Sequence, residues 1–181
     1  TGVGMNALLA RSLGEKNQTA VNRAAGTGLF LTLCTAAVFM LLGFSLATPF
    51  FRFQTANEQI IAYGQAYVRI CIGCSLGIFV QVYGERLLQA TGRTNLSMIS
   101  QIVGAVCNIV LDPILIFGLL GFPRMEVAGA AVATITGQFI GAALGLVLNH
   151  TKSPDVQLRL SGIRPHRATV ADIYAVGIPS I

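Results

Sequence analysis

Charged side chains are scarce in this chain, and tryptophan is absent. Of its 181 residues, 10% are charged and 54% are hydrophobic, whereas a soluble domain usually carries about 25% charged residues. A surface this poor in charge excludes an ordinary water-soluble domain, so the composition predicts an integral membrane protein. Without tryptophan, anchoring at the membrane interface must depend on tyrosine, phenylalanine and arginine.

Residues at metal-binding or catalytic spacing are also missing. The two histidines, His150 and His166, lie in one polar loop without a second ligand at metal-binding spacing. Cys71 and Cys74 form a C-x-x-C pattern, but inside an apolar run the packing of small residues explains it better than redox or metal chemistry does. We therefore expect no catalytic residues, no metal centre and no cofactor, and the chain is not predicted to be an enzyme.

The two ends of the sequence predict a part of a longer membrane protein. The chain begins without an initiator methionine. It also lacks the basic segment followed by an apolar segment that is typical of a signal peptide. It stops where a new apolar run is starting.

Four apolar runs are long enough to cross a bilayer, which needs about 20 apolar residues per helix. They cover residues 24–51, 60–84, 94–123 and 127–149. Arg69 and Asp112 are the only charges inside them. The runs are too long and too uniformly apolar for the roughly ten-residue alternating strands of a membrane barrel. The sequence thus predicts an all-α transmembrane bundle of four complete spans, with partial spans in residues 1–13 and 168–181.

Lysine and arginine are unevenly divided between the turns that join these runs. If the spans alternate, only Arg52 and Arg124 lie on one side, and nine basic residues lie on the other. The nine are Arg11, Lys16, Arg23, Arg86, Arg93, Lys152, Arg159, Arg164 and Arg167. Cytoplasmic loops carry such an excess, so we expect a multi-pass protein of the cell inner (plasma) membrane. Because topology explains the net charge of +5, we expect the lipid bilayer, and no nucleic acid, as a partner.

The polar residues of the third run share one helical face. Ser97, Gln101, Asn108 and Asp112 follow one another at offsets of 4, 7 and 4 residues, which keeps them on that face. A charge near the middle of a membrane costs about 3 kcal/mol or more, so Asp112 must face a bundle interior or a wet cavity. The stripe predicts a functional site. The alternative is a protonated structural carboxyl that is hydrogen-bonded to a neighbouring helix.

Pro113 strengthens the functional interpretation of Asp112. Proline has no N–H, so the carbonyl of Ile109 loses its helical partner. Together with the side-chain oxygens of Asn108 and Asp112, this carbonyl would form a cluster of hard oxygens. Such a cluster suits Na⁺ or a proton better than a soft metal.

The fourth run adds polar groups and a stripe of small residues. Thr134 and Gln138 lie one turn apart and can supply a hydroxyl and an amide, while Gln101 and Gln138 are candidates for lining a cavity. Small residues recur every four positions, which lets helix backbones approach closely. They are Gly129, Ala133, Gly137, Gly141 and Gly145. We interpret this stripe as bundle packing; a surface on which a neighbouring helix slides is the alternative.

Three charged residues elsewhere in or beside the second run are interpreted as structural. Arg69 can reach water by extending its side chain along the helix. Glu85 and Arg86 are expected to form an interfacial ion pair at the cytoplasmic edge. After the fourth run, residues 163–176 predict an amphipathic helix at the cytoplasmic interface, steeply inclined to the spans.

Several stretches together resemble the multidrug and toxic compound extrusion (MATE) family of secondary transporters. They are YGERLLQATGRTNLSMISQIVGAVCNIVLDPILIFG, GFPRMEVAGAAVATITGQ, ALLARSLGEKNQTAVNRAAGTGL and AVGIPSI. The resemblance implies a twelve-helix fold of two six-helix bundles. Residues 1–167 would form most of the first bundle, from the end of helix 2 to helix 6 and the following cytoplasmic loop. Residues 168–181 would start helix 7, and the missing helices 1 and 2 and the second bundle would complete the protein.

The resemblance also implies a function. Members of this family are secondary active multidrug efflux transporters, which export small-molecule drugs or toxic organic cations in exchange for Na⁺ or H⁺ by alternating access. An Asn and an Asp one turn apart on helix 5 form part of the family's cation site and correspond to Asn108 and Asp112, and Thr134 is the candidate for a helix 6 threonine. The helix 1 acid found in part of the family lies outside this sequence, so Na⁺ and H⁺ both stay open.

The alternative function is that of a lipid-linked oligosaccharide flippase of the same superfamily. A flippase cavity would be rich in Arg and Lys, to hold a pyrophosphate. Arg69 is the only cation within the predicted spans, which favours the drug exporter.

Overall fold

The computed structural model describes residues 2–54, 57–152, 156 and 166–178, and these residues form helices and turns without any strand. The helices are α1 (Gly2–Gly14), α2 (Gln18–Gln54), α3 (Glu58–Gly73), α4 (Leu76–Ala90), α5 (Thr94–Phe117), the 3₁₀ turn η1 (Leu119–Gly121), α6 (Glu126–Lys152) and α7 (Arg167–Gly177). The prediction of an all-α bundle is confirmed.

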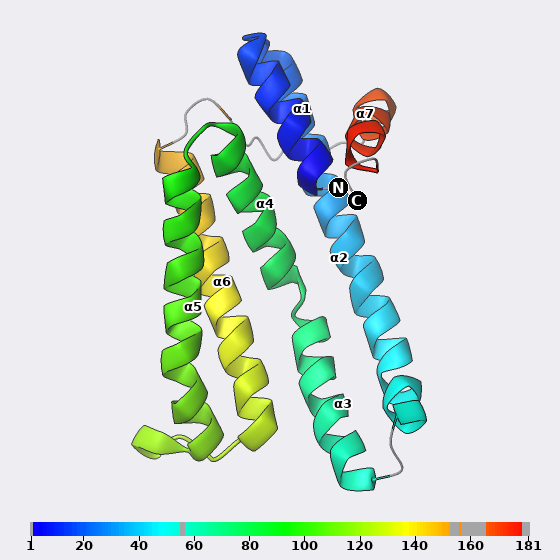
Figure 1. Ribbon diagram of the computed structural model, residues 1–181, viewed down its shortest axis with the longest axis vertical. Coiled ribbons are helices and arrows are strands. Elements are labelled where there is room, and N and C mark those ends of the chain that lie inside the picture. The colour runs from blue at the N-terminus through cyan, green and yellow to red at the C-terminus, as the bar shows by residue number, and fades with distance from the viewer. Residues whose placement is uncertain (1, 55–56, 153–155, 157–165, 179–181) are drawn as a thin grey trace.

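The long helices run up and down between two ends of the bundle (Figure 1). The α1–α2 turn, the α4–α5 turn and the last residues of α6 lie at one end, and the α2–α3 and α5–α6 connections lie at the other. The charge count requires this alternation, because it assigns the turns with Lys16 and Arg93 to one side and those with Arg52 and Arg124 to the other. That the first side is cytoplasmic stays a prediction.

For the second apolar run the sequence predicts one continuous span. The structure instead forms this run from two helices. α3 and α4 meet at a bend of 45°. At the break the hydrogen bonds tighten: the Ser75 amide donates to the Ile72 carbonyl and the Gly77 amide to the Cys74 carbonyl, each at 3.1 Å. Bonds to the third rather than the fourth preceding residue make a short 3₁₀ turn, which commonly marks a helix break. Counting this bent pair as one span, four membrane crossings are possible by length and composition among the described residues.

The third apolar run is helical only as far as Phe117. α5 continues through Pro113 and ends where Gly118 adopts a left-handed conformation with φ 72°, which glycine adopts without strain. The rest of the run, residues 118–123, forms the connection to α6 rather than a further turn of the span.

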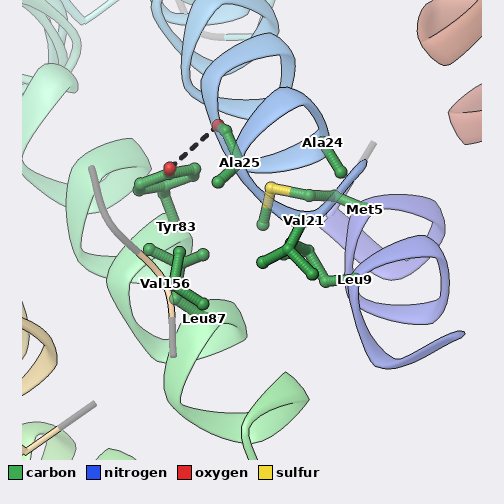
Figure 2. Packing of buried hydrophobic residues seen from close by; sticks show 8 residues of the cluster. All are labelled: Met5, Leu9, Val21, Ala24, Ala25, Tyr83, Leu87 and Val156. Carbon is green, nitrogen blue, oxygen red and sulfur yellow. Dashed lines mark hydrogen bonds between the residues drawn. The ribbon is translucent and has the colours of Figure 1, made fainter. Parts of the chain in front are cut away.

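A cluster of buried apolar residues lies where α1, α2 and α4 meet (Figure 2). Its buried residues are Met5, Leu9, Val21, Ala24, Ala25, Tyr83, Leu87 and Val156. The Tyr83 hydroxyl donates a hydrogen bond of 2.9 Å to the Ala25 carbonyl, which satisfies its only polar group in this apolar setting. Elsewhere on α2, large apolar side chains such as Phe39 and Leu41 are exposed, as a membrane-facing surface requires.

α7 is a separate short helix that packs against α1. The contact is close: a Cβ added at Gly4 would lie 3.1 Å from the Gly177 amide nitrogen and would clash with the Ile173 carbonyl. α6 ends at Lys152, so α7 is not a straight continuation of the fourth span. Of the amphipathic helix predicted for residues 163–176, the first residues, 163–165, lie outside the described residues, and its steep inclination stays a prediction.

Candidate functional site

The candidate site depends on how closely α5 and α6 approach each other. A Cβ added at Gly137 would lie 2.6 Å from the Gly104 carbonyl oxygen, and one at Gly129 would lie 2.6 Å from the Leu115 carbonyl oxygen. Both distances are too short for a real side chain, so only glycine permits this backbone contact. The small-residue stripe of α6 therefore packs against α5, as the packing interpretation predicts.

This contact brings together two of the predicted site residues. The Asn108 Nδ2 of α5 donates a hydrogen bond of 3.3 Å to the Thr134 Oγ1 of α6. The Thr134 hydroxyl in turn donates to the Ala130 carbonyl at 2.9 Å. Because the amide nitrogen and the hydroxyl proton are both engaged, the Asn108 Oδ1 and a lone pair of Thr134 can accept a further partner.

Asp112 lies one turn after Asn108 and has an unsatisfied oxygen. Its Oδ1 is buried and has no hydrogen-bond partner among the described residues. A buried acceptor without a donor costs about 1–3 kcal/mol, and more when it is charged. A proton or a small cation at this oxygen would remove that cost, so the arrangement suits a group that is neutralised by what it binds.

Tyr67 of α3 is a neighbour that the sequence analysis missed. Its side chain lies close to those of Thr134 and Cys71. A phenol can both donate and accept a hydrogen bond, so Tyr67 adds a polar group on the α3 side of the Asn108–Thr134 pair. The available signal was its spacing, because Tyr67 and Cys71 lie one turn apart on α3 and share one face of it.

The two residues predicted to line the cavity are placed differently. Gln101 does not join Asp112: its Nε2 donates to the Glu85 Oε2 of α4 at 2.8 Å. It lies 11 residues before Asp112 in the sequence, which is about 16 Å along a helix axis. Gln138 lies one turn after Thr134, is half-buried, and makes no hydrogen bond within the described part of the chain. The polar stripe of α5 therefore reaches two separate places.

Comparison with known proteins identifies the family. Residues 1–114 match the model of the MatE family. The chain belongs to the MatE family. Members of this family are multi-pass membrane transporters and not enzymes, which confirms the resemblance and the prediction that the chain has no enzymatic role.

Among relatives of this MatE chain, a probable multidrug resistance protein NorM of Thermotoga maritima is 30% identical over 178 residues, which are 98% of this chain and 38% of that protein. A FAD transporter of Shewanella oneidensis is 28% identical over 176 residues, 95% of this chain and 39% of the relative. A solved structure described as the inward-facing conformation of a multidrug resistance MATE family transporter has a TM-score of 0.90 and 27% identity, covering 99% of this chain and 40% of that one. The chain thus spans about 40% of the length of these relatives.

The charged residues around the second run differ in part from the prediction. Glu85 is 8% exposed, and Arg86 donates at 2.9 Å to the Gln89 Oε1 rather than to Glu85. The predicted Glu85–Arg86 ion pair is therefore wrong, because consecutive residues of a helix point about 100° apart. Arg69 is exposed and donates to the Thr48 Oγ1 of α2 at 3.2 Å, so it lies apart from the oxygens around Asp112.

The ligands near Asp112 also indicate which ions the MatE chain can hold there. Within the described ranges, no three His, Cys, Asp or Glu side chains gather closely enough to hold a metal ion. The available ligands are carboxylate, amide and hydroxyl oxygens, which are hard donors suited to Na⁺ or H⁺.

Proposed function

We propose that the full-length protein is a secondary active multidrug exporter of the inner (plasma) membrane, in which small organic compounds leave the cell in exchange for Na⁺ or H⁺. Family membership supports the general class of transport. The observation that carries the coupling is the buried Asp112 Oδ1 without a donor, next to the Asn108–Thr134 pair. In this proposal residues 1–167 supply most of the first bundle, and residues 168–181 start the second.

Coupling follows from differential affinity. A cation can shift an equilibrium between two conformations only if it binds one of them more tightly. Asp112 is charged when empty and neutral when it holds a proton, or balanced when it holds Na⁺ together with the Asn108 and Thr134 oxygens. The two forms differ in the cost of keeping the carboxylate buried. The loaded and empty forms therefore favour different arrangements of the bundles, as alternating access requires.

The charges inside the bundle favour cationic substrates. The buried or half-buried charged side chains of α4 and α5 are two carboxylates, Glu85 and Asp112, and one cation, Arg86. Their net charge is negative, and a negative environment attracts cations. The relative described as a FAD transporter shows that similar chains are also named for a phosphate-bearing substrate. Such a substrate, like the pyrophosphate of a flippase, would need cationic side chains in the cavity. Arg69 is exposed and donates to Thr48 of α2, and Arg86 is the cation that lines a pocket beside Met5 and Tyr83. The preference for cationic substrates therefore rests on the net charge of α4 and α5.

Asp112→Asn in the full-length transporter tests this function. The protein would be reconstituted in liposomes, and uptake or export of a fluorescent organic cation would be followed under an imposed Na⁺ or proton gradient. The substitution preserves size and hydrogen bonding but removes the charge, so we expect normal insertion and thermal stability with loss of ion-driven transport. Asp172→Asn, on the exposed face of α7, is the matched control and should transport normally. Transport by Asp112→Asn at the wild-type rate would show that Asp112 is only a structural carboxyl.

A further inference from the structure

The bundle contains a second buried carboxylate, which the coupling at Asp112 does not use. Glu85 is 8% exposed and lies in the half of α4 next to the α4–α5 turn. Its Oε1 accepts a hydrogen bond of 3.0 Å from Gln81, and its Oε2 accepts one of 2.8 Å from Gln101 of α5. Within the part of the chain that the structure describes, no Lys, Arg or His pairs with it. The carboxylate is held by neutral donors alone.

Two neutral donors do not complete the environment of a buried carboxylate. An ionised carboxylate offers about four lone-pair sites, and burial of an unbalanced charge among membrane helices is costly. Gln81 and Gln101 position the carboxylate oxygens of Glu85, but as neutral groups they do not balance its negative charge. A proton or a monovalent cation would balance it.

α6 provides an independent observation at the level of Glu85, which we call the Glu85 layer. The Asn149 Oδ1 is buried without a hydrogen-bond partner, while its Nδ2 donates to the Gly84 carbonyl at 2.8 Å. Gly84 directly precedes Glu85, so a second oxygen that lacks a donor lies at the level of the carboxylate. α6 also leaves space for the amide, because a Cβ added at Gly141 would lie 2.9 Å from the Gln81 Nε2. In the Glu85 layer, the carboxylate oxygens of Glu85 and the Asn149 Oδ1 can therefore accept a further hydrogen bond or contact a cation.

This layer is distinct from the Asp112 site but shares a helix face with it. Gln101 belongs to the α5 stripe that also carries Asn108 and Asp112, and it lies about 16 Å from Asp112 along the axis. From Gln101 the stripe continues to Ser97, which accepts a hydrogen bond of 3.3 Å from Gln89 near the α4–α5 turn. Polar groups therefore extend from Asp112 towards the end of the bundle that the charge count assigns to the cytoplasm.

Other charged or histidine side chains do not explain the environment of Glu85. The helices packed against α4 carry Arg11 (α1), Arg23 and Arg52 (α2), Asp112 (α5), and Glu126, His150 and Lys152 (α6). In the described ranges, none of these forms a hydrogen bond or an ion pair with Glu85.

We propose that Glu85, Gln81 and Gln101 form a second cation-binding site, which takes the coupling H⁺ or Na⁺ between Asp112 and the cytoplasm. This inference rests on the proposed exchange function. The second site lies on the cytoplasmic side of Asp112. It would bind a cation released from Asp112 before that cation reaches the aqueous phase. High cytoplasmic cation concentration would load the second site and slow export.

The test compares the two sides of the membrane. Full-length transporter of known orientation would be reconstituted in liposomes, and the initial rate of cation-driven dye transport would be measured against pH or Na⁺ on each side separately. Glu85→Gln should shift the half-inhibitory cytoplasmic cation concentration about tenfold or more, since loss of a ligand or its support weakens ion binding about 10–100-fold. The half-activating concentration on the outer side should stay within about twofold of wild type.

Two further variants separate binding from structure. Glu15→Gln removes a carboxylate from the exposed Arg11–Glu15 pair and should change neither concentration. Glu85→Asp retains a carboxylate and should retain the cytoplasmic dependence. If Glu85→Gln does not accumulate, Gln101→Leu, which removes one donor but leaves the charge, should shift the cytoplasmic concentration in the same way.

The outcomes are distinguishable. A cytoplasmic dependence that is unchanged in Glu85→Gln, or unchanged in Gln101→Leu where that variant is used, makes the carboxylate structural and overturns the second site, even if Asp112→Asn is inactive. A wild-type protein without any cation-dependent transport would overturn the proposed function, and the second site with it.

Discussion

Gly137→Ala links helix packing directly to the candidate cation site. A Cβ at this position would lie 2.6 Å from the Gly104 carbonyl oxygen and 3.2 Å from the Asn108 Cβ, whereas ordinary contacts begin at 3.4 Å. α5 and α6 must therefore separate by about 0.8 Å at this level, because neither backbone can compress. The Asn108–Thr134 hydrogen bond is already 3.3 Å long, and at about 4 Å it would be lost.

The expected destabilisation combines three contributions. Overpacking costs about 1–3 kcal/mol, loss of the hydrogen bond about 0.5–1.5 kcal/mol, and the better helix propensity of alanine returns about 1 kcal/mol. The free energy of unfolding should thus fall by about 0.5–3.5 kcal/mol. Because Thr134 would move away from Asn108 and Asp112, the affinity for the coupling cation should fall as well.

The assay measures both quantities on the full-length protein in detergent. Denaturant unfolding gives the stability change, and calorimetric titration with Na⁺, or with acid, gives the cation affinity. Gly14→Ala is the matched control, because a Cβ at Gly14 meets no atom within 4 Å. It should not lower the free energy of unfolding, and it should leave the cation affinity unchanged. If Gly137→Ala unfolds and binds the cation as wild type does, the close approach of α5 and α6 does not set the site geometry.

Three further outcomes are expected. Single cysteines at Lys16 and Arg93 should resist an impermeant thiol reagent applied outside the cell, and rapid external labelling would reverse the predicted orientation. Tyr83→Phe removes the hydrogen bond to the Ala25 carbonyl and should lower the free energy of unfolding by about 0.5–1.5 kcal/mol, with no change in cation affinity. Ser75→Ala removes a buried hydroxyl that has no partner in the described part of the chain, so unfolding experiments should show equal or higher stability; a clear loss would reveal a partner for that hydroxyl.

Hydrophobic run length and the positions of charges were sufficient to predict the spans. The reason is physical: a bilayer fixes the length of a helix, and helical spacing fixes which residues share a face. Placing Asn108 and Asp112 on one side of α5 required nothing more. Thr134 was identified from the family resemblance, which implies a helix 6 threonine at the site, and from its place one turn before Gln138.

The sequence could not show which helix packs against each face of α4 and α5. Gln101 lies on the same stripe as Asp112, yet it bonds to Glu85 of α4, whereas the neighbouring Ser100 donates to the Gly141 carbonyl of α6. Both α4 and α6 therefore cover that level of α5, and the sequence does not show which of them each side chain meets. Glu85 was assigned to the interface because the apolar run stops there, but α4 continues to Ala90 and buries it. The break between α3 and α4 was missed as well, because hydropathy does not change across Cys74 and Ser75.

The contact between Gly4 of α1 and Ile173 of α7 constrains the order in which the chain can fold. The two residues are about 170 positions apart, so this is a contact of very high sequence separation, which forms late because loop closure opposes it. During synthesis α1 emerges before α7, so Gly4 cannot make this contact until α7 has been made. The helices between α1 and α7 must already be packed together before the backbones at Gly4 and Ile173 can meet. α7 then covers the glycine face of a helix that was made well before it.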